Sequence, residues 1–111
     1  MAALTRAQMI TKVLRRLRVI GADQTADASD ASIVGQVLDS VHDQLRELRL
    51  APFETSSIPA WAQEPFAKCV CLDAAPYFGL QAEDNRTEAE RELSAQVMGR
   101  PMTSPTRIKS F

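Results

Sequence analysis

Two apolar stripes of helical spacing, separated by a polar segment, constrain the fold of this chain more than any other feature. In residues 6–20 the apolar side chains recur every three or four positions, which places them on one face of a helix. A longer stripe follows the polar segment ADQTADASD. The stripes predict two helices that fold back on each other as a hairpin, with the polar bridge at an exposed edge. The stripe residues are Ile10, Val13, Leu14 and Leu17, then Val34, Val37, Leu38, Val41, Leu45 and Leu48.

Residues at the ends of the stripes predict where each helix begins and ends. Thr5 followed by Gln8 has the spacing of a capping box, and Gly21 is the expected stop of the first helix. The second helix is expected to end before Pro52, because a proline ring disfavours helical geometry in the residue before it. Its candidate N-caps are Thr25, Asp27 and Ser29.

The second half of the chain predicts a third helix over residues 60–78. Its apolar side chains lack the strict alternation of a half-buried strand, and Pro59 suits a first helical turn. An internal proline removes a hydrogen bond, so Pro65 and Pro76 are expected to kink this helix or to move its start to Pro65. Gly79 is the expected end of this segment.

A fourth, shorter helix and an extended tail complete the prediction. Thr87 and Glu90 have capping-box spacing, and the helix that they open is expected to reach Gly99. The residues after Gly99 contain two prolines and no helical stripe, which indicates an extended arm. The expected fold is therefore all-α: a small bundle of about four helices over residues 1–99, with an extended C-terminal arm over residues 100–111.

Size and charge limit the classes of function. The 111 residues suffice for one domain, and a domain this small gains stability from a partner surface, which favours oligomers. With 13 Lys and Arg against 14 Asp and Glu, the net charge of −1 offers no broad cationic field to duplex DNA. No stretch approaches the roughly 20 apolar residues of a membrane span, and the first residues lack a signal-peptide layout. We expect synthesis in the cytoplasm and no membrane partner.

The residue types that carry catalysis or bind metals form no recognisable site. Cys69 and Cys71 stand in an apolar run and are expected to be buried thiols. The only histidine, His42, neighbours Asp39 and Asp43, but acids around a helical histidine are more often solvated charges than partners of a base. The sequence holds no glycine-rich phosphate loop, and its aspartates lack the spacing of a calcium loop. We therefore expect neither an enzyme nor a bound cofactor or metal.

The most concentrated charge lies on the first predicted helix. Its cationic side chains occupy much of the polar face, where they would meet water, carboxylates of a neighbouring chain, or phosphates. Water or a neighbouring chain is the favoured interpretation, because most charged helical faces are solvated or weakly paired. The group consists of Arg6, Lys12, Arg15, Arg16 and Arg18.

The order of these pieces resembles a family of phage proteins. The chain runs through LTRAQMITKVLRRLRVIG, ADQTADASDA, a striped helix ending in LRLAPF, SSIPAWAQEPFAKCVCLDAAPYFGL and the helix AEREL. In this layout it resembles the tail accessory factors, or packaged-DNA stabilisation proteins, of short-tailed bacteriophages and related head-to-tail adaptors. Many members carry a longer, strand-forming insertion between the second and third helices, where only APFETSSI stands here.

The resemblance implies a structural virion protein at the junction of head and tail. Such an adaptor docks under the portal protein as a ring of about twelve copies, extends the DNA channel and offers a platform to the next tail component. Its partners would be the portal, a downstream tail or stopper protein and its own copies, with DNA only passing through the channel. Compact helical adaptors serve short, long flexible and contractile tails, so the tail type stays open.

Two groups of residues are expected to make the contacts of this adaptor. The end of the arm combines cations with apolar anchors and is expected to bind the portal. The cations of the first helix are expected to contact neighbouring subunits or the channel. The predicted portal-binding residues are Arg107, Ile108, Lys109 and Phe111, and the predicted intersubunit or channel residues are Arg15, Arg16 and Arg18.

Two other functions are the alternatives. A small DNA-binding regulator or DNA-packaging subunit would also show a helix pair and an arginine cluster, but a DNA-reading helix-turn-helix joins its helices by three or four residues. A catalytic function, such as a cell-wall hydrolase, needs a carboxylate pair in a persuasive structural context. The pairs in this sequence are Glu90 with Glu92 and Asp39 with Asp43.

Overall fold

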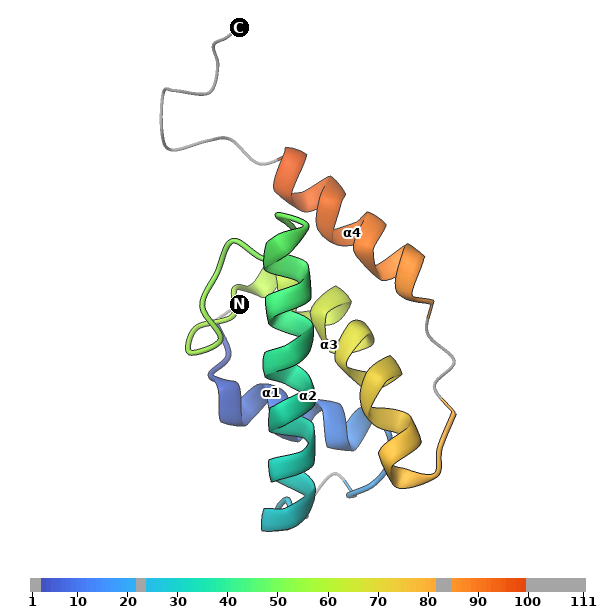
Figure 1. Ribbon diagram of the computed structural model, residues 1–111. Helices are drawn as coiled ribbons and strands as arrows, with labels where there is room; N and C mark the ends of the chain where they lie inside the picture. The colour runs from blue at the N-terminus through green and yellow to red at the C-terminus, as the bar shows by residue number, and fades with distance from the viewer. Residues whose placement is uncertain (1–2, 22–23, 82–84, 100–111) are drawn as a thin grey trace, which may run out of the picture.

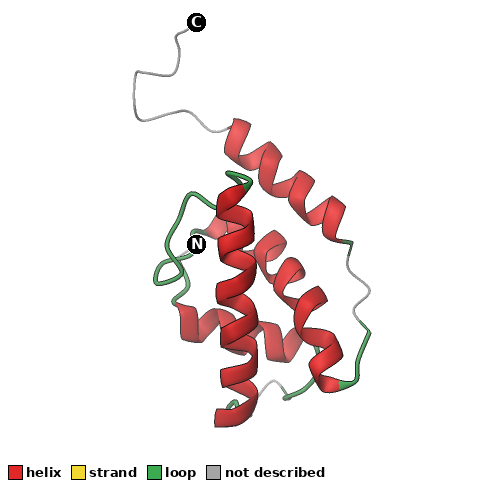
Figure 2. Ribbon diagram, viewed as in Figure 1, coloured by secondary structure: helices red, strands yellow, loops and turns green. Residues whose placement is uncertain are grey.

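A computed structural model describes residues 3–21, 24–81 and 85–99, and the regular elements in these ranges are helices (Figures 1 and 2). Within those ranges the β pairing is limited to one isolated antiparallel bridge between Leu4 and Ile58. The predicted all-α bundle of about four helices is confirmed, whereas the predicted arm over residues 100–111 lies outside the described residues. The helices are α1 (Arg6–Arg16), α2 (Ala28–Glu47), α3 (Ala60–Ala74), the short 3-10 helix η1 (Ala75–Phe78) and α4 (Arg86–Gly99).

Helix α3 holds the bundle together, because it contacts α1, α2 and α4. Helices α2 and α3 lie side by side, and α1 crosses behind both of them (Figure 1). Helix α4 lies at the outside and packs mainly on α3. The first two helices therefore do pack on each other as predicted, but as a crossed pair that shares its core with α3.

The predicted stripes form most of the core. On α1 the buried side chains are Ile10, Val13 and Leu14 of the predicted stripe, together with Met9. On α2 the side chains of the predicted stripe are buried as far as Leu45. Leu48 is 55% exposed, because α2 ends before it. The fully buried apolar side chains of α1 and α2 are Met9, Val13, Leu14, Val34, Leu38, Val41 and Leu45.

Phe66 of α3 lies at the centre of an aromatic cluster. Its side chain is fully buried, and its ring centroid lies 5.6 Å from that of Phe53 and 6.0 Å from that of His42. Both pairs have the edge-to-face arrangement that aromatic rings prefer. This cluster joins α2, α3 and the connection between them.

Helix α1 ends at Arg16, so the predicted stop at Gly21 is wrong. The chain leaves the helix at Arg18, whose φ of 62° is left-handed. The backbone N–H of Val19 donates to the Leu14 carbonyl at 2.9 Å, and that of Arg18 donates to the Arg15 carbonyl at 3.0 Å, which is the Schellman pattern. Helix α2 ends in the same way at Arg49, whose φ is 61°, before the predicted limit at Pro52.

Glycine at these two left-handed positions is expected to stabilise the fold. A left-handed backbone costs a side-chain-bearing residue roughly 1–2 kcal/mol, and the greater freedom of an unfolded glycine offsets part of that gain. We expect Arg18→Gly and Arg49→Gly each to raise the free energy of unfolding by about 0.5–1 kcal/mol in urea titrations. Gly79→Ala, the control at a φ of 68°, should lower it. A loss of stability in both glycine variants would contradict this assignment.

The third predicted helix keeps Pro65 inside it. Helix α3 begins at Ala60 with Pro59 as its N-cap, so the alternative start at Pro65 is wrong. The predicted range 60–78 continues beyond α3 as η1, which has Pro76 in its first turn. Gly79 ends the segment in a left-handed conformation, as predicted.

The predicted capping box of the fourth helix is wrong. The side-chain oxygen of Asn85 accepts a hydrogen bond from the Glu88 backbone N–H at 3.1 Å, so Asn85 caps α4. Thr87 is already inside the first turn, and Glu90 accepts from Arg86 at 2.8 Å. The Thr5 capping box of α1, in contrast, is confirmed in both of its hydrogen bonds.

Candidate functional site

The cationic group of α1 divides into paired and unpaired side chains. Arg6 donates two hydrogen bonds to Asp39 of α2, at 3.1 and 3.0 Å. A methyl group at Gly35 would lie 2.7 Å from the Arg6 guanidinium, so the glycine lets Arg6 cross α2 to reach its partner. Arg15 and Arg18 are exposed and form no ion pair with the described residues.

Glu64 at the start of α3 joins two cations of α1. Its carboxylate oxygens lie 3.0 Å from Lys12 Nζ and 3.0 Å from Arg16 Nη1. The hydrogen bond from Lys12 is the main cause that lowers the pKa of Glu64 below its ordinary value of 4.5, with partial desolvation opposing it. Arg16, one of the predicted intersubunit or channel cations, is therefore engaged with a carboxylate of its own chain.

The Glu64 contacts predict a small pH-dependent stabilisation. Because the folded-state pKa lies below the unfolded value, the stabilisation is present above pH 4.5 and is lost as the pH falls through the folded-state pKa. Glu64→Gln should therefore lower the free energy of unfolding near neutral pH, by less than about 1 kcal/mol because the side chain is half exposed. Urea titrations at pH 7 and pH 3 check this, and an equal loss at both values would contradict it.

The outer side of α1 borders an open hollow of about 790 Å³. Three cations line it together with polar and apolar side chains, and Arg15 forms no ion pair with the described residues. We call this surface the α1 face. Its lining residues are Leu4, Ala7, Gln8, Thr11, Lys12, Arg15, Arg16 and Gln63.

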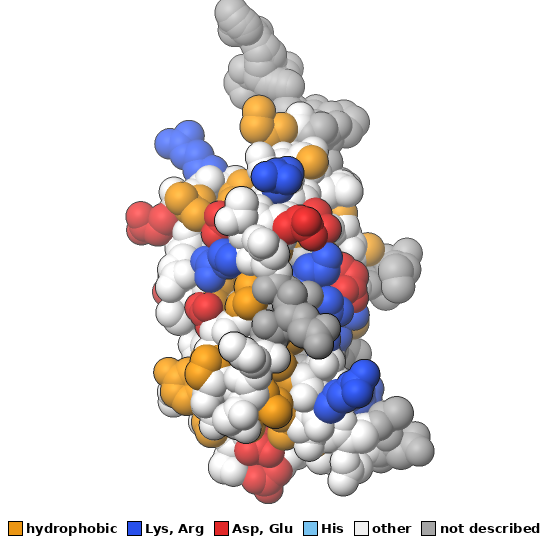
Figure 3. All heavy atoms as spheres, turned by 90° about the vertical axis from the view of Figure 1, so that its right-hand side faces the viewer, with side chains coloured by type: hydrophobic (Ala, Val, Ile, Leu, Met, Phe, Trp, Pro, Cys, Tyr) orange, Lys and Arg blue, Asp and Glu red, His pale blue; other side chains and the backbone are white. Residues whose placement is uncertain are grey.

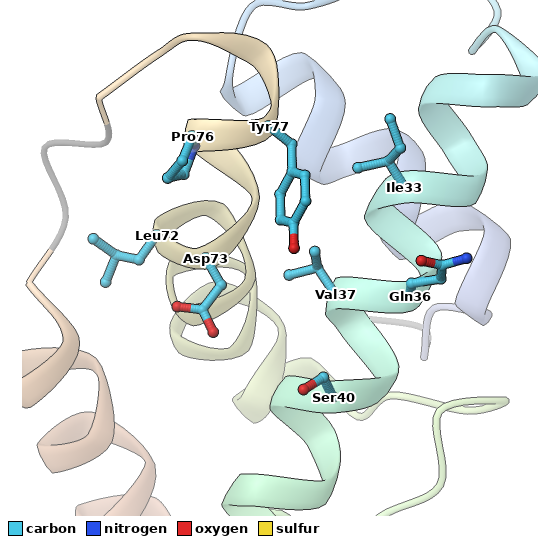
Figure 4. Close-up of a pocket in the computed structure, with 8 residues that line it drawn as sticks. All are labelled: Ile33, Gln36, Val37, Ser40, Leu72, Asp73, Pro76 and Tyr77. Atoms are coloured by element: carbon cyan, nitrogen blue, oxygen red, sulfur yellow. The ribbon is translucent and has the colours of Figure 1, made fainter.

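A second hollow, of about 450 Å³, lies between α2 and the end of α3 (Figure 4). The ring of Tyr77 stands between the two helices, and its side chain is 67% exposed. Asp73 lies on the opposite wall from Ser40 of α2. We call this surface the α2–α3 groove, and its lining residues are Ile33, Gln36, Val37, Ser40, Leu72, Asp73, Pro76 and Tyr77.

The two surfaces lie on opposite sides of the bundle. The α2–α3 groove opens toward the viewer in Figure 4, where α1 runs behind both helices. The α1 side chains Gln8, Thr11 and Arg15 lie across the helix axis from its buried stripe and so point away from the groove. Sequence reasoning found the cations of the α1 face but missed the groove, which two segments far apart in the sequence build together.

The candidate catalytic residues are engaged in structural contacts. His42 is buried, its Nε2 lies 2.6 Å from the Phe53 carbonyl oxygen, and Asp39 accepts hydrogen bonds from Arg6. Glu90 and Glu92 point to different partners, Arg86 and Lys68. In the other acid pair of the hydrolase alternative, Asp39 with Asp43, the carboxylate of Asp39 is engaged with Arg6.

The cysteines and the other residue types that bind metals were candidates for a site in the sequence. Cys69 and Cys71 are buried thiols, as predicted. Over the described ranges, no three His, Cys, Asp or Glu side chains are grouped closely enough to hold a metal ion. A search of the same ranges finds no helix with the length and apolar character of a membrane span.

Charges of both signs are mixed on the side of the molecule that carries α3 and α4. In Figure 3, Lys and Arg side chains stand among Asp and Glu side chains, with hydrophobic side chains gathered at the lower left. Such a face has no field of a single sign to attract a polyanion.

Comparisons with protein families, with curated proteins and with solved structures find no match for this chain. The resemblance to head-to-tail adaptors therefore rests on the residues quoted above. The predicted portal-binding residues, Arg107, Ile108, Lys109 and Phe111, lie outside the described part of the chain.

Proposed function

We propose that this protein is a structural head-to-tail adaptor of a bacteriophage. It docks as a ring under the portal, extends the DNA channel and offers a platform for the next tail component. The observation that carries this proposal is the pair of unlike open surfaces, the α1 face and the α2–α3 groove, on opposite sides of one small bundle. A ring is built from heterologous contacts, in which two different surfaces of each copy meet.

The two surfaces also differ in charge. Arg15 brings positive charge to the α1 face, and Arg18 adds a second charge just beyond the end of α1; neither forms an ion pair with the described residues. Asp73 lines the groove, and Asp30 and Asp43 lie on the same side of α2, one turn before Ile33 and one turn after Ser40. In the proposed ring, the α1 face of one copy meets the groove side of the next, and the opposite charges orient the contact.

This arrangement leaves the C-terminal arm for the portal, as the resemblance implies, and other surfaces for the downstream tail protein. DNA passes through the channel without a sequence-specific contact. The chain performs no catalysis in this proposal, which agrees with the structural contacts that occupy His42, Glu90 and Glu92.

We expect the isolated protein to be a monomer in dilute solution and to form a ring only on portal rings. The lateral contact is weak because its charges are exposed, and a template raises the effective concentration of neighbouring copies. Light scattering should give the mass of one chain. Arg15→Glu should reduce ring formation on portals, whereas Arg91→Glu, an exposed cation on α4, should not. A salt-stable dodecamer without portal would contradict the expectation.

The DNA-binding alternative is disfavoured by the connection between α1 and α2. It spans residues 17–27, several times the three or four residues of a helix-turn-helix. Titration with duplex DNA distinguishes the two functions. Strong, sequence-selective binding would overturn the adaptor proposal, whereas weak binding that disappears at moderate salt agrees with it.

A further inference from the structure

The α2–α3 groove exposes apolar surface that the described chain leaves uncovered. Tyr77 is 67% exposed, and Ile33 and Leu72 are only partly buried. In Figure 4, Tyr77, Ile33 and Val37 face the space between α2 and the end of α3, whereas the side chain of Leu72 points away from α2. An exposed aromatic side chain beside partly buried apolar ones is typical of an interaction surface.

The rim of the groove is acidic. Asp73 lines the groove itself, and Asp30 and Asp43 continue the α2 side of it at either end. Arg86 forms an ion pair with Asp73 at 3.6 Å and also contacts Glu90 and Gln44, whereas Asp30 and Asp43 form no ion pair with the described residues. A segment that binds here would therefore be apolar and cationic.

The C-terminal arm has this composition. Residues 100–111 contain Arg100, Arg107 and Lys109 and no acidic residue. Ile108 and Phe111 supply apolar side chains at the end of the arm. In an extended chain with about three residues per turn, these two side chains fall on one side.

The length of the arm fits the distance to the groove. Arg86 lies 3.6 Å from Asp73, so α4 starts beside the groove and, with its 14 residues, ends roughly 20 Å from it. An extended chain covers roughly 3.1 Å per residue, so six or seven residues of the arm return to the groove. The remaining residues are 107–111, the segment that combines cations with Ile108 and Phe111.

We propose that residues 107–111 dock in the α2–α3 groove of their own chain in the free protein. Ile108 and Phe111 pack against Tyr77 and Ile33, and Arg107 and Lys109 lie near the acidic rim. Docking does not depend on the adaptor proposal. The consequence of docking does rest on the adaptor function: the docked arm covers a surface of the lateral ring contact until the portal binds the arm.

Amide NMR spectra of the full chain test this proposal. The full-length double variant Ile108→Ser/Phe111→Ser should shift the amide resonances of Ile33, Val37 and Tyr77 relative to the unmodified chain. Met102→Ser removes an apolar side chain from the arm outside residues 107–111 and should leave them unchanged. The shift should be the same in dilute and concentrated samples, because the contact is within one chain.

A reciprocal change in the groove supplies the second measurement. Tyr77→Ala should move the resonances of residues 107–111 to unfolded-chain positions, whereas Leu80→Ala, exposed but outside the groove, should not. Groove resonances that are identical in the unmodified chain and the double variant would overturn the proposal. A shift that grows with protein concentration would also overturn it, because the arm would then belong to another copy. Loss of portal binding with docking intact would overturn the adaptor function alone.

Discussion

Replacing Phe66 with alanine is expected to lower the free energy of unfolding by about 3–5 kcal/mol. The side chain is fully buried and makes edge-to-face contacts with Phe53 and His42. Its removal leaves a cavity where α2, α3 and their connection meet. Since small domains have a total stability of roughly 5–15 kcal/mol, a large share of the fold's stability depends on this one ring.

Urea titration followed by circular dichroism measures this loss. Met98→Ala is the control, because Met98 is also a large apolar side chain but is 81% exposed, and it should cost less than about 0.5 kcal/mol. Equal losses in the two variants would contradict the placement of Phe66 at the centre of the core.

Removal of the residues after Arg100 is expected to abolish co-sedimentation with portal rings. The helical circular dichroism and the melting temperature should stay nearly unchanged, because the helices and the core of the described residues lie before the arm. A few aromatic and apolar anchors dominate the energy of most interfaces, so Phe111→Ala and Ile108→Ala should each give part of the loss.

The same truncation separates a binding arm from a terminus without a role. Met102→Ser is the control within the arm and should keep portal binding. If the truncated chain binds portals as well as the full chain does, the arm is not the portal-binding element.

The helices could be predicted from the sequence because their signals are local. Apolar spacing and the Thr5 capping box identify α1, and the stripe through Leu45 identifies most of α2. The C-terminal ends of α1 and α2 could not be predicted in the same way. Arg18 and Arg49 adopt a conformation that glycine usually fills, since the packing of Val19 and Leu50 against the core outweighs the local preference.

The candidate surfaces depend on contacts between distant segments, which spacing cannot reveal. Glu64 engages Lys12 and Arg16, so only part of the predicted cationic group stays available to a partner. The α2–α3 groove brings Ile33 and Val37 together with Tyr77, which lies more than 35 positions later in the sequence. In the sequence, Tyr77 between Pro76 and Gly79 shows only that a helix is ending.

Electron microscopy of portal rings mixed with the full chain tests the adaptor function most directly. The portal is expected to be encoded close to this protein's own gene, which identifies the partner to use. We expect an added ring at one end of the portal, coaxial with its channel and with about twelve copies. Portal rings that remain unchanged at saturating protein would contradict it.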